Sequence, residues 1–258
     1  MKNSVTTFYD ELADHYHLLF ADWDKSIERQ AEILKGLFEK TGIPHDAVIL
    51  DCACGIGTQA LGLARIGYNV AGSDISGEAI ARARHEAEKR DLQVPFAIAD
   101  FSHLGTSFDQ YFDCIIAMDN ALPHVTDASG LKKALAAIYG QLAIGGTFFA
   151  SIRDYDSILR NKPISSTPSV MNTPKGRRIA FQVWDWHEEL YDFTQYIVHD
   201  EGGILDTVRT CSIYWAISRA KLGELLSSVG FAEVRWLMPE ESGYYQPIVI
   251  GKKDQGKE

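Results

Sequence analysis

The composition of this chain excludes several classes of protein. Its 258 residues are 46% hydrophobic, which is enough to bury one α/β core with an insertion. The formal net charge is −10 and the longest basic run is Lys175–Arg178, whereas nucleic-acid binding depends on clustered Lys and Arg. No apolar stretch approaches the ~18 residues of a membrane span, no signal-peptide pattern opens the chain, and four cysteines fit a reducing compartment. We therefore expect a cytoplasmic protein that binds neither nucleic acid nor membrane.

The first predicted element is a helical segment over residues 8–40. Its apolar side chains recur at helical spacing, and acidic residues occupy the other face. Gly42 and Pro44 end the segment, because both residue types stop helices.

A glycine-rich turn follows the first predicted strand. The apolar run at 47–51 opens into a turn that contains Gly55 and Gly57. A helix at 58–66 and a second strand at 68–74 come next. Such a unit binds a nucleoside, because glycines let the backbone approach a ligand closely.

Two acids indicate which nucleoside the turn accepts. Asp74 ends the second strand, where a carboxylate accepts hydrogen bonds from ribose hydroxyls. Asp51 precedes the turn, where a carboxylate repels the phosphates of a dinucleotide but suits the ammonium of an amino-acid-bearing nucleoside. Ala60 stands at the third glycine position of the dinucleotide fingerprint, a replacement that this motif sometimes allows. A nicotinamide dinucleotide therefore stays open as a distant alternative.

The third strand ends in a pair of residues that suits an adenine ring. A helix capped by Ser76 runs to about Arg90, and a strand at 94–99 leads to Asp100 and Phe101. The acid can accept a hydrogen bond from the exocyclic amine, while the aromatic ring stacks on the base. A surface turn with a buried phenylalanine is the alternative.

The alternation of strands and helices predicts a parallel sheet. A strand at 112–118, buried on both faces, is followed by the polar loop Asp119–His124, a helix at 129–142 and a strand at 147–152. Open α/β sheets bind ligands at the carboxyl ends of their strands, which is where this loop lies.

The spacing of apolar residues changes in the second half of the chain. Three segments rich in aromatic and β-branched residues, Arg178–Trp186, Tyr191–Asp200 and Val208–Ile217, predict antiparallel strands inserted in the parallel core. A last helix and two closing strands are expected at 218–229, 231–237 and 244–251.

The glycine turn with its acids resembles the cofactor motifs of Rossmann-like S-adenosylmethionine-dependent methyltransferases. Two later segments, Asp119–Val125 and Arg153–Leu159, resemble signatures of the glycine and glycine/sarcosine N-methyltransferases. The resemblance covers most of the chain and implies a mostly parallel Rossmann-like α/β sheet with helices on both faces. It also implies an antiparallel insertion between the fifth strand and the last helix. S-adenosylmethionine would be the cofactor and a small amine or amino acid the acceptor, with the oligomeric state open.

The resemblance implies a set of cofactor-binding residues. In this superfamily an N-terminal segment often folds over the nucleoside, which implies that Tyr16 caps the pocket; packing on the protein body is the alternative. Cys52 and Cys54 lack the Cys or His partners of a zinc site, so no metal is expected. The residues expected at the cofactor are Tyr16, Asp51, Cys52, Ala53, Gly55, Gly57, Asp74, Ile75, Asp100, Phe101 and Met118.

The same resemblance assigns the acceptor site to Asn120 and Arg153. In the family the asparagine helps to hold the substrate amino acid and the arginine grips its carboxylate, a role that suits a guanidinium fork. A salt bridge within the Arg153–Asp156 segment is the alternative. Tyr214 is expected near the substrate amine, and His124 either takes the proton of that amine or braces the loop.

Several positions depart from the family pattern. The family has a glycine at Asp119 and tyrosines at Leu19, Ala180 and Phe181. A less polar pocket with an additional acid predicts an amine or amino acid other than glycine.

We expect three parts: an N-terminal helical lid at 1–45, a core at 46–155 and 216–252, and a substrate-covering insertion at 156–215. The alternatives to N-methylation are O- or C-methylation of a small metabolite, or binding of the cofactor without turnover.

Overall fold

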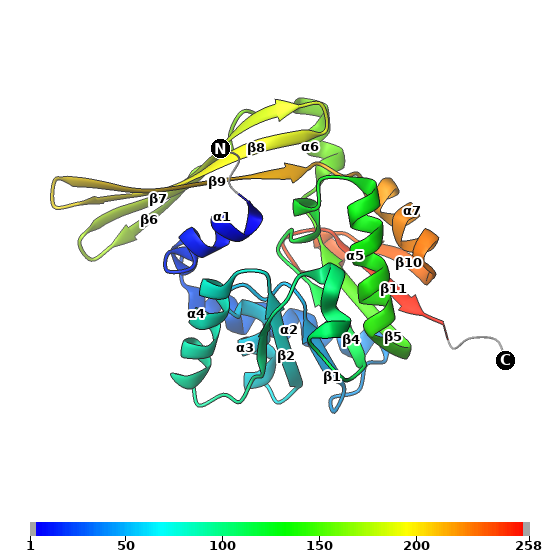
Figure 1. Cartoon of the computed structure of the whole chain (residues 1–258). Coiled ribbons are helices and arrows are strands. Elements are labelled where there is room, and N and C mark those ends of the chain that lie inside the picture. The colour runs from blue at the N-terminus through cyan, green and yellow to red at the C-terminus, as the bar shows by residue number, and fades with distance from the viewer. Residues whose placement is uncertain (1–3, 255–258) are drawn as a thin grey trace.

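The computed structural model describes residues 4–254, which form two β-sheets with helices packed around them (Figure 1). The larger sheet has seven strands in the order β10-β11-β5-β4-β1-β2-β3. Only β11 runs antiparallel to its neighbours, β5 and β10. These strands are β1 (Val48–Asp51), β2 (Asn69–Asp74), β3 (Phe96–Ile98), β4 (Phe112–Ala117), β5 (Leu142–Ser151), β10 (Phe231–Leu237) and β11 (Ile248–Lys253). The predicted fold class is therefore confirmed.

Helices cover both faces of this sheet, so its central strands are mainly apolar. On β4, Ile115 packs in one apolar cluster and Ile116 in the other, as expected for a strand buried on both faces. The first cluster includes side chains of α5 and α7, and the second includes those of α2, α3 and α4. The helix bounds are α2 (Trp23–Thr41), α3 (Thr58–Arg65), α4 (Gly77–Glu88), α5 (Ala128–Gln141) and α7 (Arg219–Val229). No helix within residues 4–254 combines the length and apolarity needed to cross a membrane.

The second sheet is fully antiparallel and has the strand order β6-β7-β8-β9. It crosses the top of the molecule in Figure 1, with the hairpin ends of its long strands projecting to the left. Helix α1 (Val5–Leu12) packs between β9 and α4, so the N-terminal segment joins the two sheets. The strands are β6 (Ser169–Thr173), β7 (Gly176–His187), β8 (Leu190–Glu201) and β9 (Ile204–Trp215).

The helix predicted over residues 8–40 is wrong as a single element. The segment divides into α1, a 3-10 turn η1 (Tyr16–Leu19) and α2. Asp22 starts α2 afresh, because its side chain accepts a hydrogen bond from the Lys25 backbone N–H at 3.1 Å. This break lets the aromatic residues before it turn toward the sheets.

Other differences concern short or polar elements. The edge strand β6 is mainly polar and was not predicted, and neither were the short helices α6 (Tyr155–Asn161) and α8 (Pro239–Ser242). Strand β5 begins directly after α5 at Leu142, and β11 begins at Ile248, four residues later than predicted. The division into lid, core and insertion stays a prediction.

Candidate functional site

The turn between β1 and α3 needs glycine at two positions. Gly55 has φ of 52° and Gly57 has φ of 96°, a left-handed backbone that disfavours other residues. A Cβ at Gly57 would lie 3.0 Å from the Leu61 side chain, whereas one at Gly55 would meet no atom within 4 Å. The backbone at Gly55 therefore faces open space that a ligand can occupy.

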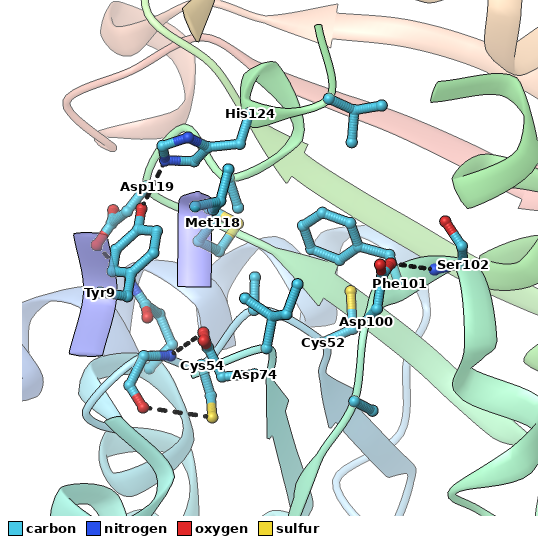
Figure 2. Close-up of a pocket in the computed structure, with 18 of the residues that line it drawn as sticks. Tyr9, Cys52, Cys54, Asp74, Asp100, Phe101, Ser102, Met118, Asp119 and His124 are labelled. Carbon is cyan, nitrogen blue, oxygen red and sulfur yellow. Dashed lines mark hydrogen bonds between the residues drawn. The ribbon is translucent and has the colours of Figure 1, made fainter. Parts of the chain in front are cut away.

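That open space is a cavity of about 340 Å³, which we call the cofactor cavity. It lies at the carboxyl ends of the parallel strands, and Tyr9 from the N-terminal segment lines it (Figure 2). Tyr16 lines it as well. Asp51 and Gly57 do not line it. The predicted residues that do line it are Tyr16, Cys52, Ala53, Gly55, Asp74, Ile75, Asp100, Phe101 and Met118.

Asp74 is held with its carboxylate in a fixed orientation. Its Oδ2 accepts a hydrogen bond from the Gly55 N–H at 2.8 Å, and its Oδ1 accepts one from the Ser76 N–H at 2.9 Å. Each oxygen keeps a further acceptor position, which suits the two hydroxyls of a ribose. Burial raises the pKa of the Asp74 carboxyl, because the charged form loses its hydration.

Asp100 and Phe101, the acid and the aromatic ring predicted to bind adenine, both line the cofactor cavity. Asp100 caps the 3-10 segment η2 (Phe101–Thr106), and its Oδ1 accepts from the Ser102 N–H at 2.7 Å. Phe101 lies beside it at the cavity wall (Figure 2). The remaining carboxylate oxygen is placed to accept from an exocyclic amine.

His124 lines the cofactor cavity and lies outside the lining of the neighbouring cavity. Its Nε2 shares a hydrogen bond of 2.9 Å with the hydroxyl of Tyr9, a residue that the sequence analysis missed (Figure 2). Burial lowers the pKa of His124 to about 3, and the nearby charge of Arg153 adds to the effect. The imidazole is therefore neutral at pH 7 and a weak base, which favours the bracing role.

A second cavity of about 670 Å³, which we call the acceptor cavity, lies beneath the antiparallel sheet. Its walls come from the N-terminal segment, the loops after β4 and β5, and strand β7. Asn120, Arg153 and Tyr214 line it, as the resemblance implied. Tyr9, Tyr16 and Asp119 line both cavities, so the two spaces share one wall.

Arg153 presents a half-buried cation to the acceptor cavity. Its Nη1 donates to the Tyr191 hydroxyl at 3.0 Å and its Nη2 to Gln182 Oε1 at 2.9 Å. The guanidinium lies 5.2 Å from the ring centroid of Tyr214 and 5.3 Å from that of Trp184. Desolvation by itself lowers the pKa of this guanidinium. The nearby tyrosines and the hydrogen bond to Tyr191 outweigh that effect, so the pKa is raised and the group stays charged.

The alternative that Arg153 pairs with its neighbouring acids is wrong. Asp154 and Asp156 pair instead with Arg219, at 2.5 Å and 3.2 Å. Within residues 4–254, no carboxylate lies within 4.0 Å of the Arg153 guanidinium. Even a half-buried charge is stabilised by a counter-ion, so this cation suits an anionic ligand.

Asn120 helps to position Arg153 through a hydrogen bond to its backbone. Its Oδ1 accepts from the Arg153 backbone N–H at 3.0 Å, and its Nδ2 donates to the Tyr155 hydroxyl at 2.9 Å. The residue has φ of 69°, a left-handed conformation that asparagine tolerates well. One amide hydrogen and one acceptor position remain for a ligand.

Asp119 is held by side chains from distant parts of the chain. Its Oδ2 accepts from Gln59 Nε2 at 2.9 Å, and its Oδ1 accepts from the hydroxyls of Tyr245, at 2.7 Å, and Tyr244. The sequence analysis missed these three partners, because only the fold brings α3 and the segment before β11 to the end of β4. The result is a fixed carboxylate on the wall between the cavities.

Comparison with known proteins shows similarity to methyltransferases. Residues 49–146 match the family described as a methyltransferase domain. A glycine/sarcosine N-methyltransferase of Parasynechococcus marenigrum (strain WH8102) is 28% identical over 59% of this chain and 52% of that protein. A solved S-adenosylmethionine-dependent methyltransferase from Clostridium acetobutylicum ATCC 824 shares the fold with a TM-score of 0.74 at 17% identity, over 95% of this chain and 99% of that one. Residues 49–146 thus match a methyltransferase domain, and the chain shares the fold of solved S-adenosylmethionine-dependent methyltransferases.

The curated relatives differ in the acceptor that their names give. The chain spans about half the length of three glycine/sarcosine N-methyltransferases that it matches, namely 52%, 50% and 58%. A sterol 24-C-methyltransferase of Saccharomyces cerevisiae is 30% identical over 70% of this chain and 45% of that protein.

The residues of this protein fit S-adenosylmethionine. Asp51 is fully buried behind the glycine turn, and within residues 4–254 neither of its oxygens accepts a hydrogen bond. Burial raises its pKa well above the usual range, and the charges of Asp119 and Asp74 add to the effect. A cationic ligand nearby would stabilise the ionised form of this carboxyl. Asp74 suits the ribose of the cofactor and Asp100 with Phe101 its adenine.

Proposed function

We propose that this protein transfers the methyl group of S-adenosylmethionine to the amino nitrogen of an amino acid or a related small amine. The observation that carries the proposal is the half-buried Arg153 guanidinium, which lines the acceptor cavity and has no carboxylate partner among the described residues. Two of its five N–H groups are used within the protein, so three remain for a carboxylate. A two-point grip of this kind matches the geometry of a carboxylate.

The shared wall supports the choice of nitrogen as the methylated atom. Asp119 lies where a ligand held by Arg153 would approach the cofactor cavity, since both residues line the acceptor cavity and Asp119 lines both. An anion on this wall and a cation deeper in the cavity match the two charges of an amino acid. A hydroxyl or carbon acceptor would leave the Asp119 carboxylate without a positive partner.

The residues of the chain act by positioning. When bound, S-adenosylmethionine supplies a methyl group already activated by its sulfonium. Arg153 fixes the carboxylate of the acceptor, and Asp119 draws its ammonium to the shared wall. Tyr214, stacked on Phe193 with 4.5 Å between ring centroids, closes one side of the acceptor cavity. Such positioning can contribute several kcal/mol to catalysis, provided that water is excluded from the reacting atoms.

The ammonium must lose a proton before the nitrogen can attack. His124 is a poor candidate, because it lies outside the acceptor cavity and its pKa of about 3 makes it a weak base. Water in the open acceptor cavity takes the proton as the substrate settles against Arg153. Tyr9 then keeps His124 fixed as part of the cofactor wall.

A labelled-methyl transfer assay tests the proposal. The acceptors are glycine, sarcosine, dimethylglycine, the other common amino acids and their decarboxylated amines, with product sites identified by mass spectrometry. We expect methyl on nitrogen and a preference for acceptors that carry a carboxylate. Label on oxygen or carbon would refute N-methylation. Binding of S-adenosylmethionine without label in any acceptor would indicate a cofactor-binding protein that does not catalyse transfer.

A further inference from the structure

We infer that the acceptor is an amino acid with a large apolar side chain, and that glycine and sarcosine are poor substrates. This inference rests on the proposed N-methylation and adds the substrate class. The acceptor cavity, at about 670 Å³, is larger than the cofactor cavity, at about 340 Å³. At ~30 Å³ per water molecule, it has room for on the order of 20 waters, and glycine would displace only a few of them.

Water remaining beside the reacting amine would oppose the reaction. Methyl transfer to an amine requires a nitrogen stripped of its hydration in a site that excludes water. With glycine held between Arg153 and Asp119, most of the acceptor cavity would stay wet. A long apolar side chain on the same amino acid would expel that water and gain the free energy of its own burial.

The N-terminal segment and strand β7 provide the apolar walls for such a side chain. Leu19 and Phe20 line the acceptor cavity from the end of η1, and Ala180 lines it from β7. Ala180 shares its strand face with Gln182, whereas the ring of Phe181 lies on the other face and stacks on Tyr196 at 5.1 Å. The small side chain of Ala180 thus leaves room on the face that meets the cavity.

Two glutamines at the antiparallel sheet, Gln182 and Gln195, are already committed to protein partners. Gln182 Oε1 accepts from Arg153 Nη2 and from Trp184 Nε1, while its Nε2 donates to Gln195 Oε1 at 3.0 Å. Gln195 Nε2 donates to the carbonyls of Phe181 and Tyr196, each at 3.0 Å. These two amides keep one hydrogen between them for a ligand, so the wall favours an apolar side chain over a polar one.

The test compares acceptors of increasing side-chain volume. Labelled-methyl transfer is measured with glycine, sarcosine, alanine, leucine, phenylalanine and tryptophan, alongside calorimetric binding of each to the protein saturated with S-adenosylhomocysteine. We expect kcat/KM for leucine or phenylalanine to exceed that for glycine by about tenfold or more. A higher kcat/KM for glycine or sarcosine would overturn the inference and leave the proposed function intact. Tight binding of large amino acids without methylation would refute the proposed function and leave the inferred preference for a large side chain intact. If the protein neither binds nor methylates any of these amino acids, both claims are refuted.

A variant that fills the cavity gives an independent check. Ala180→Phe should lower the ratio of kcat/KM for phenylalanine to kcat/KM for glycine by about tenfold or more, because the new ring overlaps the site of the large side chain and not that of glycine. Val183→Phe places the same aromatic side chain on the opposite face of β7 and serves as the control. Calorimetric affinity for S-adenosylhomocysteine confirms that both variants are folded. An equal loss for glycine and phenylalanine in Ala180→Phe would contradict the assignment of this wall.

Discussion

Replacement of Arg153 by methionine separates recognition of the acceptor from binding of the cofactor. Methionine keeps an apolar stem against Trp184 and Tyr214 but removes the charge and all five N–H donors. Since Arg153 lines the acceptor cavity and not the cofactor cavity, the affinity for S-adenosylhomocysteine should change little. The matched control is Arg219→Met. Arg219 is a nearby arginine, and neither it nor its partners, Asp154 and Asp156, line either cavity.

The size of the effect follows from the hydrogen bonds lost. A hydrogen bond to a charged group contributes ~1.5–3 kcal/mol, and two such bonds hold a carboxylate in a fork. Because the variant also relieves the partial burial of an unpaired cation in the free protein, we take about 3 kcal/mol as the net loss in binding. At 1.4 kcal/mol per tenfold change, this corresponds to roughly a hundredfold rise in KM.

The assay compares each amino acid that the wild-type protein methylates with its decarboxylated amine. Wild-type protein and Arg219→Met should prefer the amino acid by roughly a hundredfold, and Arg153→Met should lose that preference. The amine, which has no carboxylate to lose, should be methylated about equally well by all three proteins. If Arg153→Met retains the preference for the carboxylate, the guanidinium does not bind it and the proposed acceptor site is wrong.

Three further predictions concern the cofactor wall and stability. Asp74→Asn should weaken S-adenosylhomocysteine binding about tenfold or more by calorimetry, because ribose loses a charged acceptor; unchanged affinity would remove that assignment. His124→Asn should keep the fall of kcat/KM at acidic pH that the wild-type protein shows, since a pKa of about 3 leaves the imidazole neutral over the pH range of the assay. If the variant loses this fall, His124 is the base. Burial opposes ionisation of Glu86, but hydrogen bonds from Arg90 and Arg82 lower its pKa to about 2, so its stabilisation is present above the unfolded pKa and lost as pH falls. Glu86→Gln should therefore reduce the urea-derived unfolding free energy by about 2 kcal/mol at pH 7 and by little near pH 2, and an equal loss at both would contradict the linkage.

The cofactor half of the site could be predicted from local sequence. The turn with Gly55 and Gly57, and the acids at the ends of β1 and β2, belong to one continuous unit whose conformation depends on nearby residues. Asp100 and Phe101 follow at the end of the next strand. Parallel strands place their carboxyl ends at one edge of the sheet, so these residues had to meet there.

The N-terminal segment shows where local patterns fail. Helical spacing of apolar residues continues across residues 8–40, yet the chain breaks twice because Asp22 caps a new helix and the aromatic residues before it pack against two different sheets. The spacing of apolar residues shows which face of a helix is apolar. It does not show whether that face packs against one part of the protein or several. The contact between Tyr9 and His124, 115 residues apart, was therefore beyond prediction from sequence.

The sequence by itself determined the fold class, the nucleoside-binding turn and the chemical types at the acceptor site, because each depends on short-range pattern and residue identity. Only the tertiary structure decided that Arg219 takes the acids beside Arg153, that Gln59, Tyr244 and Tyr245 hold Asp119, and how large the acceptor cavity is. These features join segments far apart in the chain. Their geometry follows from how two sheets and α1 pack together, which no local pattern encodes.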